Sequence, residues 1–146
     1  MIVILDTDHL TVIQRKTEPG YSNLRKRLQA VPERNVCTTI ISFEEQMRGW
    51  LSLISKAKAG HEVAAYKRLR TLLEFFAETP IVDYDDAAAR QYSLLRRSRL
   101  AVGSMDLKIA SIALSKAAIL LTCNTKDFAR VPKLTAEDWT RSHLQA

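Results

Sequence analysis

Short apolar segments alternate along this chain with longer segments of helical periodicity, and this alternation constrains the fold more than any other feature. The first apolar segment, 2–5, stops abruptly at Asp6. Further strands are predicted at 35–41, 80–82 and 118–122, and an edge strand or final turn at 134–139. Parallel neighbouring strands need crossover connections, which helices supply. The pattern therefore predicts an α/β protein, a three-layer α/β/α sandwich with a central, mostly parallel sheet.

Helical periodicity predicts helices at 7–16, 62–78, 85–97 and 104–116, and one that begins at Ser42. Glu45 stands three residues after Ser42, which predicts a capping box. Apolar stripes predict that this helix and the next form an antiparallel hairpin with a core-facing side. The stripe residues are Phe43, Met47, Trp50, Leu51, Ile54, Val63, Tyr66, Leu69, Leu72, Leu73 and Phe76. The basic segment Arg25, Lys26 and Arg27 is expected to face water or an anion, and 124–132 to be a polar connection.

The composition fits one ordered domain that spans residues 1–146. A net charge of +6 favours an anionic partner such as a nucleic acid, although it also serves solubility. Only five residues precede Asp6, and no apolar run approaches the roughly 18 residues that span a bilayer. We therefore expect no membrane segment and a cytoplasmic location.

The cysteines and histidines show no metal-binding spacing. Cys37 and Cys123 lie far apart in apolar runs, which predicts buried free thiols in a reducing cytosol. His9, His61 and His143 show no HxxxH spacing and are expected to have no nearby cysteine partner, so a zinc site is not expected.

Four acidic residues are candidates for chemistry: Asp6, Glu45, Asp106 and Asp127. Each has a structural explanation as a helix cap, a capping box, a dipole partner or a turn residue. The predicted topology, however, brings all four towards one sheet edge, where they would repel one another unless a divalent cation were bound. Mg²⁺ and Mn²⁺ prefer such oxygen ligands and assist phosphodiester hydrolysis.

The acidic run at 83–86 is a weaker candidate. It superficially suggests an aspartate-nucleophile phosphatase or a phosphoacceptor pocket, but it directly precedes a predicted helix. Capping that helix and complementing its dipole explain the run without catalysis.

Four motifs together resemble one family, the PIN-domain ribonucleases of the VapC toxin type. The motifs are LDTDHL at 5–10, ISFEEQMRG at 41–49, GSMDLKIA at 103–110 and LTCNTKDFARVP at 121–132. The resemblance runs nearly end to end, and it implies a PIN-like fold and a metal-dependent endoribonuclease that acts as the toxin of a toxin–antitoxin module.

The resemblance implies that Asp6, Glu45, Asp106 and Asp127 are both the catalytic residues and the ligands of Mg²⁺, with Mn²⁺ as a substitute. Glu45 is preferred to Glu44 because the family places its acid four residues before the glycine, here Gly49. Many relatives carry an aspartate where Asn124 stands, so Asn124 or Asp127 completes the site.

Implied partners are an RNA substrate, with transfer RNA and ribosomal RNA both compatible, a VapB-type antitoxin and a second copy of the chain. The antitoxin would dock a helix and can place an arginine in the acidic pocket. The hairpin face with Trp50, Leu51 and Ile54 is a candidate groove, although core packing explains these residues equally well. Two alternatives stay open: a catalytically silent PIN-like RNA-binding module and a structure-specific DNA nuclease.

Overall fold

The computed structural model describes residues 1–142 of the chain. Its five strands form one parallel sheet in the order β3-β2-β1-β4-β5. The strands are β1 (Val3–Leu5), β2 (Val36–Thr39), β3 (Ile81–Val82), β4 (Ile119–Leu121) and β5 (Thr135–Glu137). Every predicted strand is therefore present, and the segment at 134–139 is an edge strand paired with β4.

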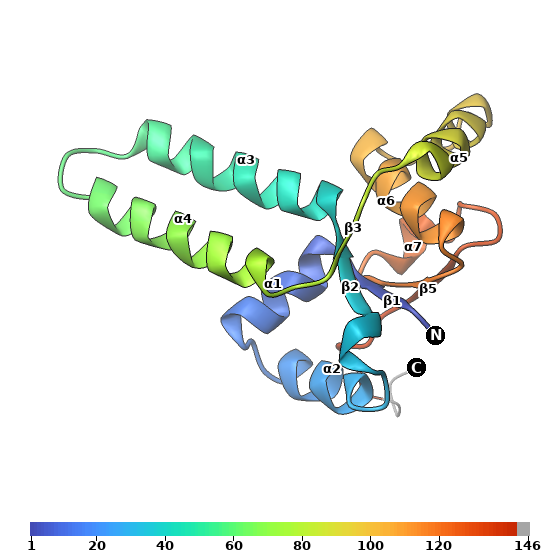
Figure 1. The fold of residues 1–146 in the computed structure, drawn as a ribbon, viewed down its shortest axis with the longest axis horizontal. Coiled ribbons are helices and arrows are strands. Elements are labelled where there is room, and N and C mark those ends of the chain that lie inside the picture. The colour runs from blue at the N-terminus through green and yellow to red at the C-terminus, as the bar shows by residue number, and fades with distance from the viewer. Residues whose placement is uncertain (143–146) are drawn as a thin grey trace.

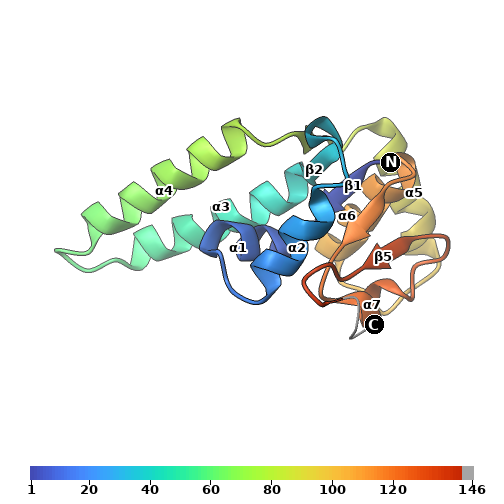
Figure 2. The same cartoon turned by 90° about the horizontal axis from the view of Figure 1, so that it is seen from below.

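Helices connect the strands and cover both faces of the sheet (Figures 1 and 2). They are α1 (Thr7–Arg15), α2 (Gly20–Leu28), the 3₁₀ helix η1 (Glu33–Asn35), α3 (Ile40–Lys56), α4 (Glu62–Ala77), α5 (Asp86–Arg97), α6 (Ser104–Ser115) and α7 (Thr125–Phe128). The predicted α/β/α sandwich is confirmed. No helix within residues 1–142 is both long and apolar enough to cross a bilayer.

The residues of β1 show why the sheet is buried on both faces. Successive strand side chains point to opposite faces. Val3 and Leu5 join a core formed with α1, α2 and α4, whereas Ile4 joins a second core formed with α5, α6 and α7. All three side chains are almost fully buried, as expected of a central parallel strand.

Strand β2 ends, and α3 begins, earlier than predicted. The β-branched run suggested a strand through residue 41, but pairing with β3 stops at Thr39 and the chain turns helical at Ile40. The Thr39 hydroxyl accepts a hydrogen bond from the Ser42 backbone N–H at 3.1 Å and caps the helix. The predicted capping box of Ser42 and Glu45 is therefore wrong, because Thr39 already satisfies that N–H group.

Two α-helices were not predicted, nor was the 3₁₀ helix η1. Segment 20–28 forms α2, which buries Leu24 against the sheet while its last turn carries Arg25, Lys26 and Arg27. The expected polar connection at 124–132 contains α7, which is anchored by the fully buried Phe128. In each case one buried apolar residue holds an otherwise polar helix against the core. A single apolar residue produces no helical periodicity in the sequence, so these helices were not predicted.

Helices α3 and α4 form the predicted antiparallel hairpin, which extends away from the sheet (Figure 1). Near the sheet the hairpin is packed, and the rings of Phe43 and Phe76 meet edge to face at 5.0 Å. Farther out, Leu51 is 50% and Val63 is 66% exposed. The outer half of the predicted core stripe is therefore largely exposed, because the sheet does not reach it. In the inner half the stripe is correct except for Leu73, which is 59% exposed beside the buried Leu72.

Candidate active site

The carboxyl ends of β1 and β4 lie side by side, since Leu5 pairs with Leu121. The next residue of each strand is polar. Asp6 accepts a hydrogen bond from the Thr122 hydroxyl at 2.8 Å with one carboxylate oxygen. Its other oxygen accepts the Thr7 N–H at 2.8 Å and caps α1. Asp6 is thus fixed in place at the edge where parallel sheets bind ligands.

Glu45 reaches the same edge from α3. Its carboxylate accepts a hydrogen bond from the Thr7 hydroxyl at 2.9 Å, which joins α3 to the first residue of α1. Glu44 points elsewhere and forms a surface ion pair with Arg48 at 2.6 Å. The structure therefore places Glu45, rather than Glu44, beside Asp6.

Asp106 lies in the first turn of α6 and Asp127 lies in α7. The Asp127 carboxylate accepts hydrogen bonds from Asn124 at 3.1 Å and from the Arg130 guanidinium at 2.8 Å. Both of its oxygens are therefore engaged. The two residues that could complete the site, Asn124 and Asp127, are hydrogen-bonded to each other.

Burial and mutual repulsion raise the pKa values of three of these carboxyl groups. Burial, with the charge of Asp8 adding to it, raises the pKa of Asp6 to about 6. Partial burial and then the charge of Asp106 raise the pKa of Glu45. Partial burial and then the charges of Asp127 and Asp8 raise the pKa of Asp106. The carboxyl groups therefore form one electrostatically coupled cluster.

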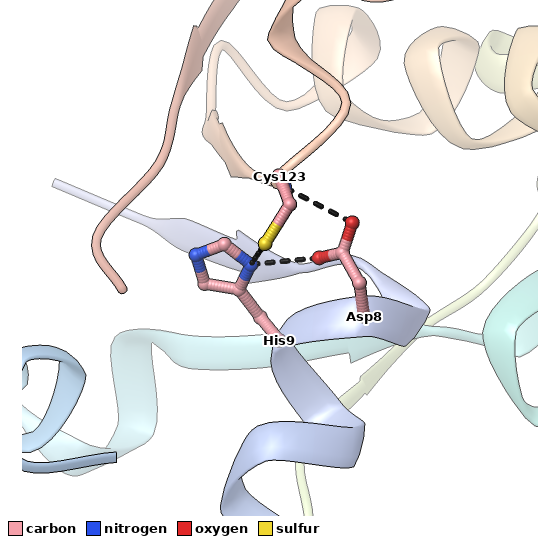
Figure 3. A group of neighbouring side chains, drawn as sticks. All are labelled: Asp8, His9 and Cys123. Atoms are coloured by element: carbon pink, nitrogen blue, oxygen red, sulfur yellow. Dashed lines mark hydrogen bonds and ion pairs between the residues drawn. The ribbon is translucent and has the colours of Figure 1, made fainter. Parts of the chain in front are cut away.

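Asp8 belongs to this cluster, although it was not among the predicted site residues. Burial alone would raise its pKa, but hydrogen bonds from His9 and from the Cys123 N–H outweigh burial, and the pKa is lowered. The His9 ring nitrogen Nδ1 lies 2.7 Å from the Asp8 carboxylate, and the Cys123 N–H donates to Asp8 at 3.0 Å (Figure 3). Asp8 therefore stays ionised and adds negative charge beside Asp6.

Asp8, His9 and Cys123 are close enough for one ligand atom of each to lie within 4.8 Å of the others. The hydrogen bonds of His9 assign its tautomer. Nδ1 donates to the ionised Asp8, and Nε2 accepts the Trp139 N–H at 3.2 Å. Neither nitrogen has a free lone pair, so in this arrangement His9 acts as a hydrogen-bond bridge between Asp8 and the chain after β5.

Two expectations about these residues were wrong. Cys123 is exposed rather than buried, because it follows β4 instead of lying within it. His9 does have a cysteine neighbour, at 3.9 Å between Sγ and Nδ1. Cys37 is buried as predicted. Although the residue is exposed, its neighbours partly desolvate the thiol, and this desolvation, followed by the charge of Asp8, raises the pKa of Cys123 to about 11. The thiol is therefore neutral near pH 7 and a poor nucleophile. His143 lies outside the described residues.

The donor chemistry of Asp6, Glu45 and Asp106 fits a hard divalent cation. All three offer carboxylate oxygens, which Mg²⁺ and Mn²⁺ prefer. Their raised pKa values also mean that their negative charges are poorly compensated by the protein itself. A cation would relieve that repulsion and favour the ionised forms.

Residues 3–134 match the PIN domain family. The chain belongs to the PIN domain family. This PIN domain is 28% identical to ribonuclease VapC2 of Rickettsia felis, over 97% of this chain and 100% of the relative. It is also 28% identical to the tRNA(fMet)-specific endonuclease VapC of Salmonella typhimurium, over 93% of this chain and 96% of the relative.

Solved structures show the same fold. A DNA-bound VapBC structure from Salmonella typhimurium aligns with a TM-score of 0.75 and 26% identity, over 95% of this PIN domain and 98% of that chain. A VapBC2 structure from Rickettsia felis, bound to a promoter DNA fragment, gives a TM-score of 0.72 and 28% identity, over 95% and 99% of the two chains.

The acidic run at 83–86 lies outside this cluster. Asp85 accepts the Ala88 N–H at 3.0 Å and caps α5, as predicted, and it pairs with Lys116 at 3.2 Å. Sequence reasoning missed three polar residues of the PIN-domain site: Thr7, Asp8 and Thr122. Their position directly after β1 and β4 was the available signal, because every polar residue at that sheet edge is a candidate.

Proposed function

We propose that this chain is a metal-dependent endoribonuclease that hydrolyses RNA phosphodiester bonds as the toxin of a toxin–antitoxin module, acting as one domain in the cytoplasm. The observation that carries this proposal is the coupled cluster of Asp6, Glu45 and Asp106 at the carboxyl edge of a PIN-domain sheet. The relatives named ribonuclease and tRNA endonuclease, which align over nearly the whole chain, support the reaction class.

The metal-binding residues in this proposal are Asp6, Glu45 and Asp106, with Asp127 and its hydrogen-bond partner Asn124 near Asp106. Mg²⁺, or Mn²⁺ in its place, supplies positive charge to the scissile phosphate and lowers the pKa of a bound water. Thr122 and Thr7 hold the carboxylates of Asp6 and Glu45 in fixed orientations through hydrogen bonds of 2.8 and 2.9 Å. Arg130 holds Asp127 at 2.8 Å, so Asp127 contributes chiefly negative charge near Asp106.

The substrate in this proposal is RNA, and the specificity in the name of the Salmonella relative makes transfer RNA the first candidate, with ribosomal RNA the second. A net charge of +6 suits a polyanion.

The proposed partners are a VapB-type antitoxin and a second copy of the chain. A cavity of about 550 Å³ lies between α1, α3 and α4, and its lining combines the apolar side chains of Trp50, Leu72 and Phe75 with polar and basic ones, among them Arg15 and Arg68. Gln14 and Gln46 bond to each other across its wall at 2.9 and 3.0 Å. An amphipathic antitoxin helix fits such a groove. Trp50, Leu51 and Ile54 were the candidate groove residues in the sequence, and of these three Trp50 lines this cavity.

The test is to incubate total cellular RNA with the purified full-length protein in Mg²⁺, in Mn²⁺ and in chelator, and to map cut ends by sequencing. Asp6→Asn is compared with Asp86→Asn, a matched change at an exposed aspartate of α5. We expect discrete cuts that require metal and Asp6 and that persist in Asp86→Asn. RNA binding without cutting, or cutting of structured DNA alone, would overturn the proposal in favour of a silent binding module or a DNA nuclease.

A further inference from the structure

A polar cavity lies between the end of α5 and the start of α6, near the acidic cluster. Its volume is about 450 Å³, and its lining includes Tyr92, Arg96, Arg99 and Ser104. We call it the Tyr92 pocket. Helices α5 and α6 lie side by side along it (Figure 1). Arg96 and Arg99 are exposed, so their guanidinium groups are accessible from solvent.

Cations surround the ring of Tyr92. The Arg96 guanidinium carbon lies 5.8 Å and the Lys108 ammonium nitrogen 5.7 Å from the centre of the ring. The ring is itself held edge to face against Tyr84 at 6.3 Å. Cation–π contacts fix such side chains without neutralising their charge. Positive charge is therefore held in place at Arg96 in the lining of the pocket and at Lys108 beside the same ring.

This charge is not compensated by ion pairs in the described part of the chain. Among residues 1–142, no carboxylate lies within 4.0 Å of a charged nitrogen of Arg96, Arg99 or Lys108. Arg130 and Lys116, which lie on neighbouring segments, are by contrast both paired with aspartates. Like charges gathered at a cavity repel one another, and an anion in the cavity would relieve that repulsion.

The Tyr92 pocket adjoins the candidate active site through two connections. Ser104 and Leu107 line the pocket, while Asp106 lies between them on the same turn of α6 and faces the other carboxylates. Arg130 donates hydrogen bonds to the Ala101 carbonyl at 3.0 Å and to Asp127 at 2.8 Å. The connection from α5 to α6, which bounds the pocket, is thereby tied to the acidic cluster.

We propose that the Tyr92 pocket binds a backbone phosphate of the RNA strand, next to the phosphate that is cleaved. The guanidinium groups of Arg96 and Arg99 match phosphate oxygens in shape and charge, and the Ser104 hydroxyl can donate a further hydrogen bond. The pocket thus positions the strand, whereas the acidic cluster cleaves it. This assignment rests on the proposed function, because it takes RNA as the substrate.

The test measures binding of a short single-stranded RNA oligonucleotide by fluorescence anisotropy, in an Asp106→Asn background so that no strand is cut. Arg96→Gln/Arg99→Gln is compared with Lys56→Gln/Lys58→Gln, which removes the same charge from the far end of the hairpin. We expect Kd to rise about 10-fold or more in the pocket variant, and the slope of log Kd against log salt to fall by about 0.7 for each lost phosphate contact. The control is expected to stay within about twofold.

An equal rise in Kd in both double variants, or an unchanged Kd in the pocket variant, would overturn the assignment of the Tyr92 pocket as a phosphate-binding site. Cleavage kinetics with Asp106 restored give a second readout: loss of the pocket is expected to raise KM about as much as Kd. The two proposals fail separately. If the wild type cuts RNA and the pocket variant binds RNA with unchanged Kd, only the phosphate-binding role of the Tyr92 pocket is refuted. If RNA binds through the pocket but is never cut, only the proposed nuclease activity is refuted.

Discussion

Asp6 combines two tasks that oppose each other at the level of a single residue. Its carboxylate caps α1 and accepts the Thr122 hydroxyl, which requires a fixed and buried position. Burial then disfavours its charge, which a metal ligand needs. The metal-free protein is therefore expected to be less stable at neutral pH than its packing alone would allow.

This conflict predicts a pH dependence of stability. The pKa of Asp6 is raised from 3.8 to about 6, so the folded state binds this proton more tightly than the unfolded state. Its contribution to the free energy of unfolding is fully present below about pH 4 and is lost as the pH rises through about 6, a change of about 3 kcal/mol. Urea titrations of metal-free protein at about pH 4.5 and 7.5 measure the free energy of unfolding at the two pH values. We expect the Asp6→Asn variant to lack the decrease that the wild type shows between them, because the variant cannot titrate at this position.

Mg²⁺ provides the control for this prediction. Added at neutral pH, it is expected to stabilise the wild type and to have much less effect on Asp6→Asn, because the variant lacks a ligand charge. Identical pH profiles of the two proteins would refute the assigned pKa.

The site residues show which roles a sequence can predict. Asp6, Glu45 and Asp106 were proposed from their positions at strand ends and helix starts, and the structure brings them together. Asp8 was missed because its place in the cluster and its charge depend on the backbone N–H of Cys123, more than one hundred residues away. Hydrogen bonds between distant segments leave no periodic trace in the sequence.

At the level of elements, α3 matters most because it carries Glu45 to the site. Its first turn is fixed by Thr39, the last residue of β2, whose hydroxyl accepts the Ser42 N–H. The end of a strand and the cap of a helix are thus the same residue, so any movement of this junction moves Glu45.

Thr39→Ala is expected to lower the free energy of unfolding by about 1 kcal/mol or more, because it leaves a buried N–H group uncapped. Thr39→Ser keeps the oxygen and serves as the control. Chemical denaturation of both variants checks the prediction, and equal losses in the two would show that the methyl group, rather than the cap, is responsible.

The errors in the sequence-based elements have the same origin. Ile40 and Ile41 are β-branched and favour strand locally, but tertiary pairing ends at Thr39 and the helix begins there. Helix α2 has a mostly polar sequence and one buried anchor, Leu24. Local propensity therefore located the strands and the longer helices, but it missed α2, and the ends of the elements were decided by contacts with other elements.

At the level of the whole molecule, the alternation of strands and helices was sufficient to predict the sandwich. The strand order and the extension of the hairpin beyond the sheet were not predictable from it. Exposure of Leu51 and Val63 on that hairpin depends on where the sheet ends, which no local pattern records.

The net charge of +6 leads to a prediction for the intact protein. RNA binding by the uncleaving Asp106→Asn variant is expected to weaken linearly in log Kd against log salt, with a slope of about 2 if roughly three phosphates are neutralised. Anisotropy titrations over a range of salt check this. Binding that does not depend on salt would show that the basic surface is not the RNA contact.

The most direct test of the central claim is the rate of Mg²⁺-dependent cleavage of purified transfer RNA by Glu45→Gln and Glu44→Gln. The two variants remove one charge each from adjacent residues of α3, and only Glu45 is hydrogen-bonded to Thr7 in the acidic cluster. We expect Glu45→Gln to lose roughly 100-fold or more of the rate and Glu44→Gln to stay within about twofold of wild type. Equal rates in the two variants, or a loss confined to Glu44→Gln, would contradict the assignment of this cluster as the nuclease centre.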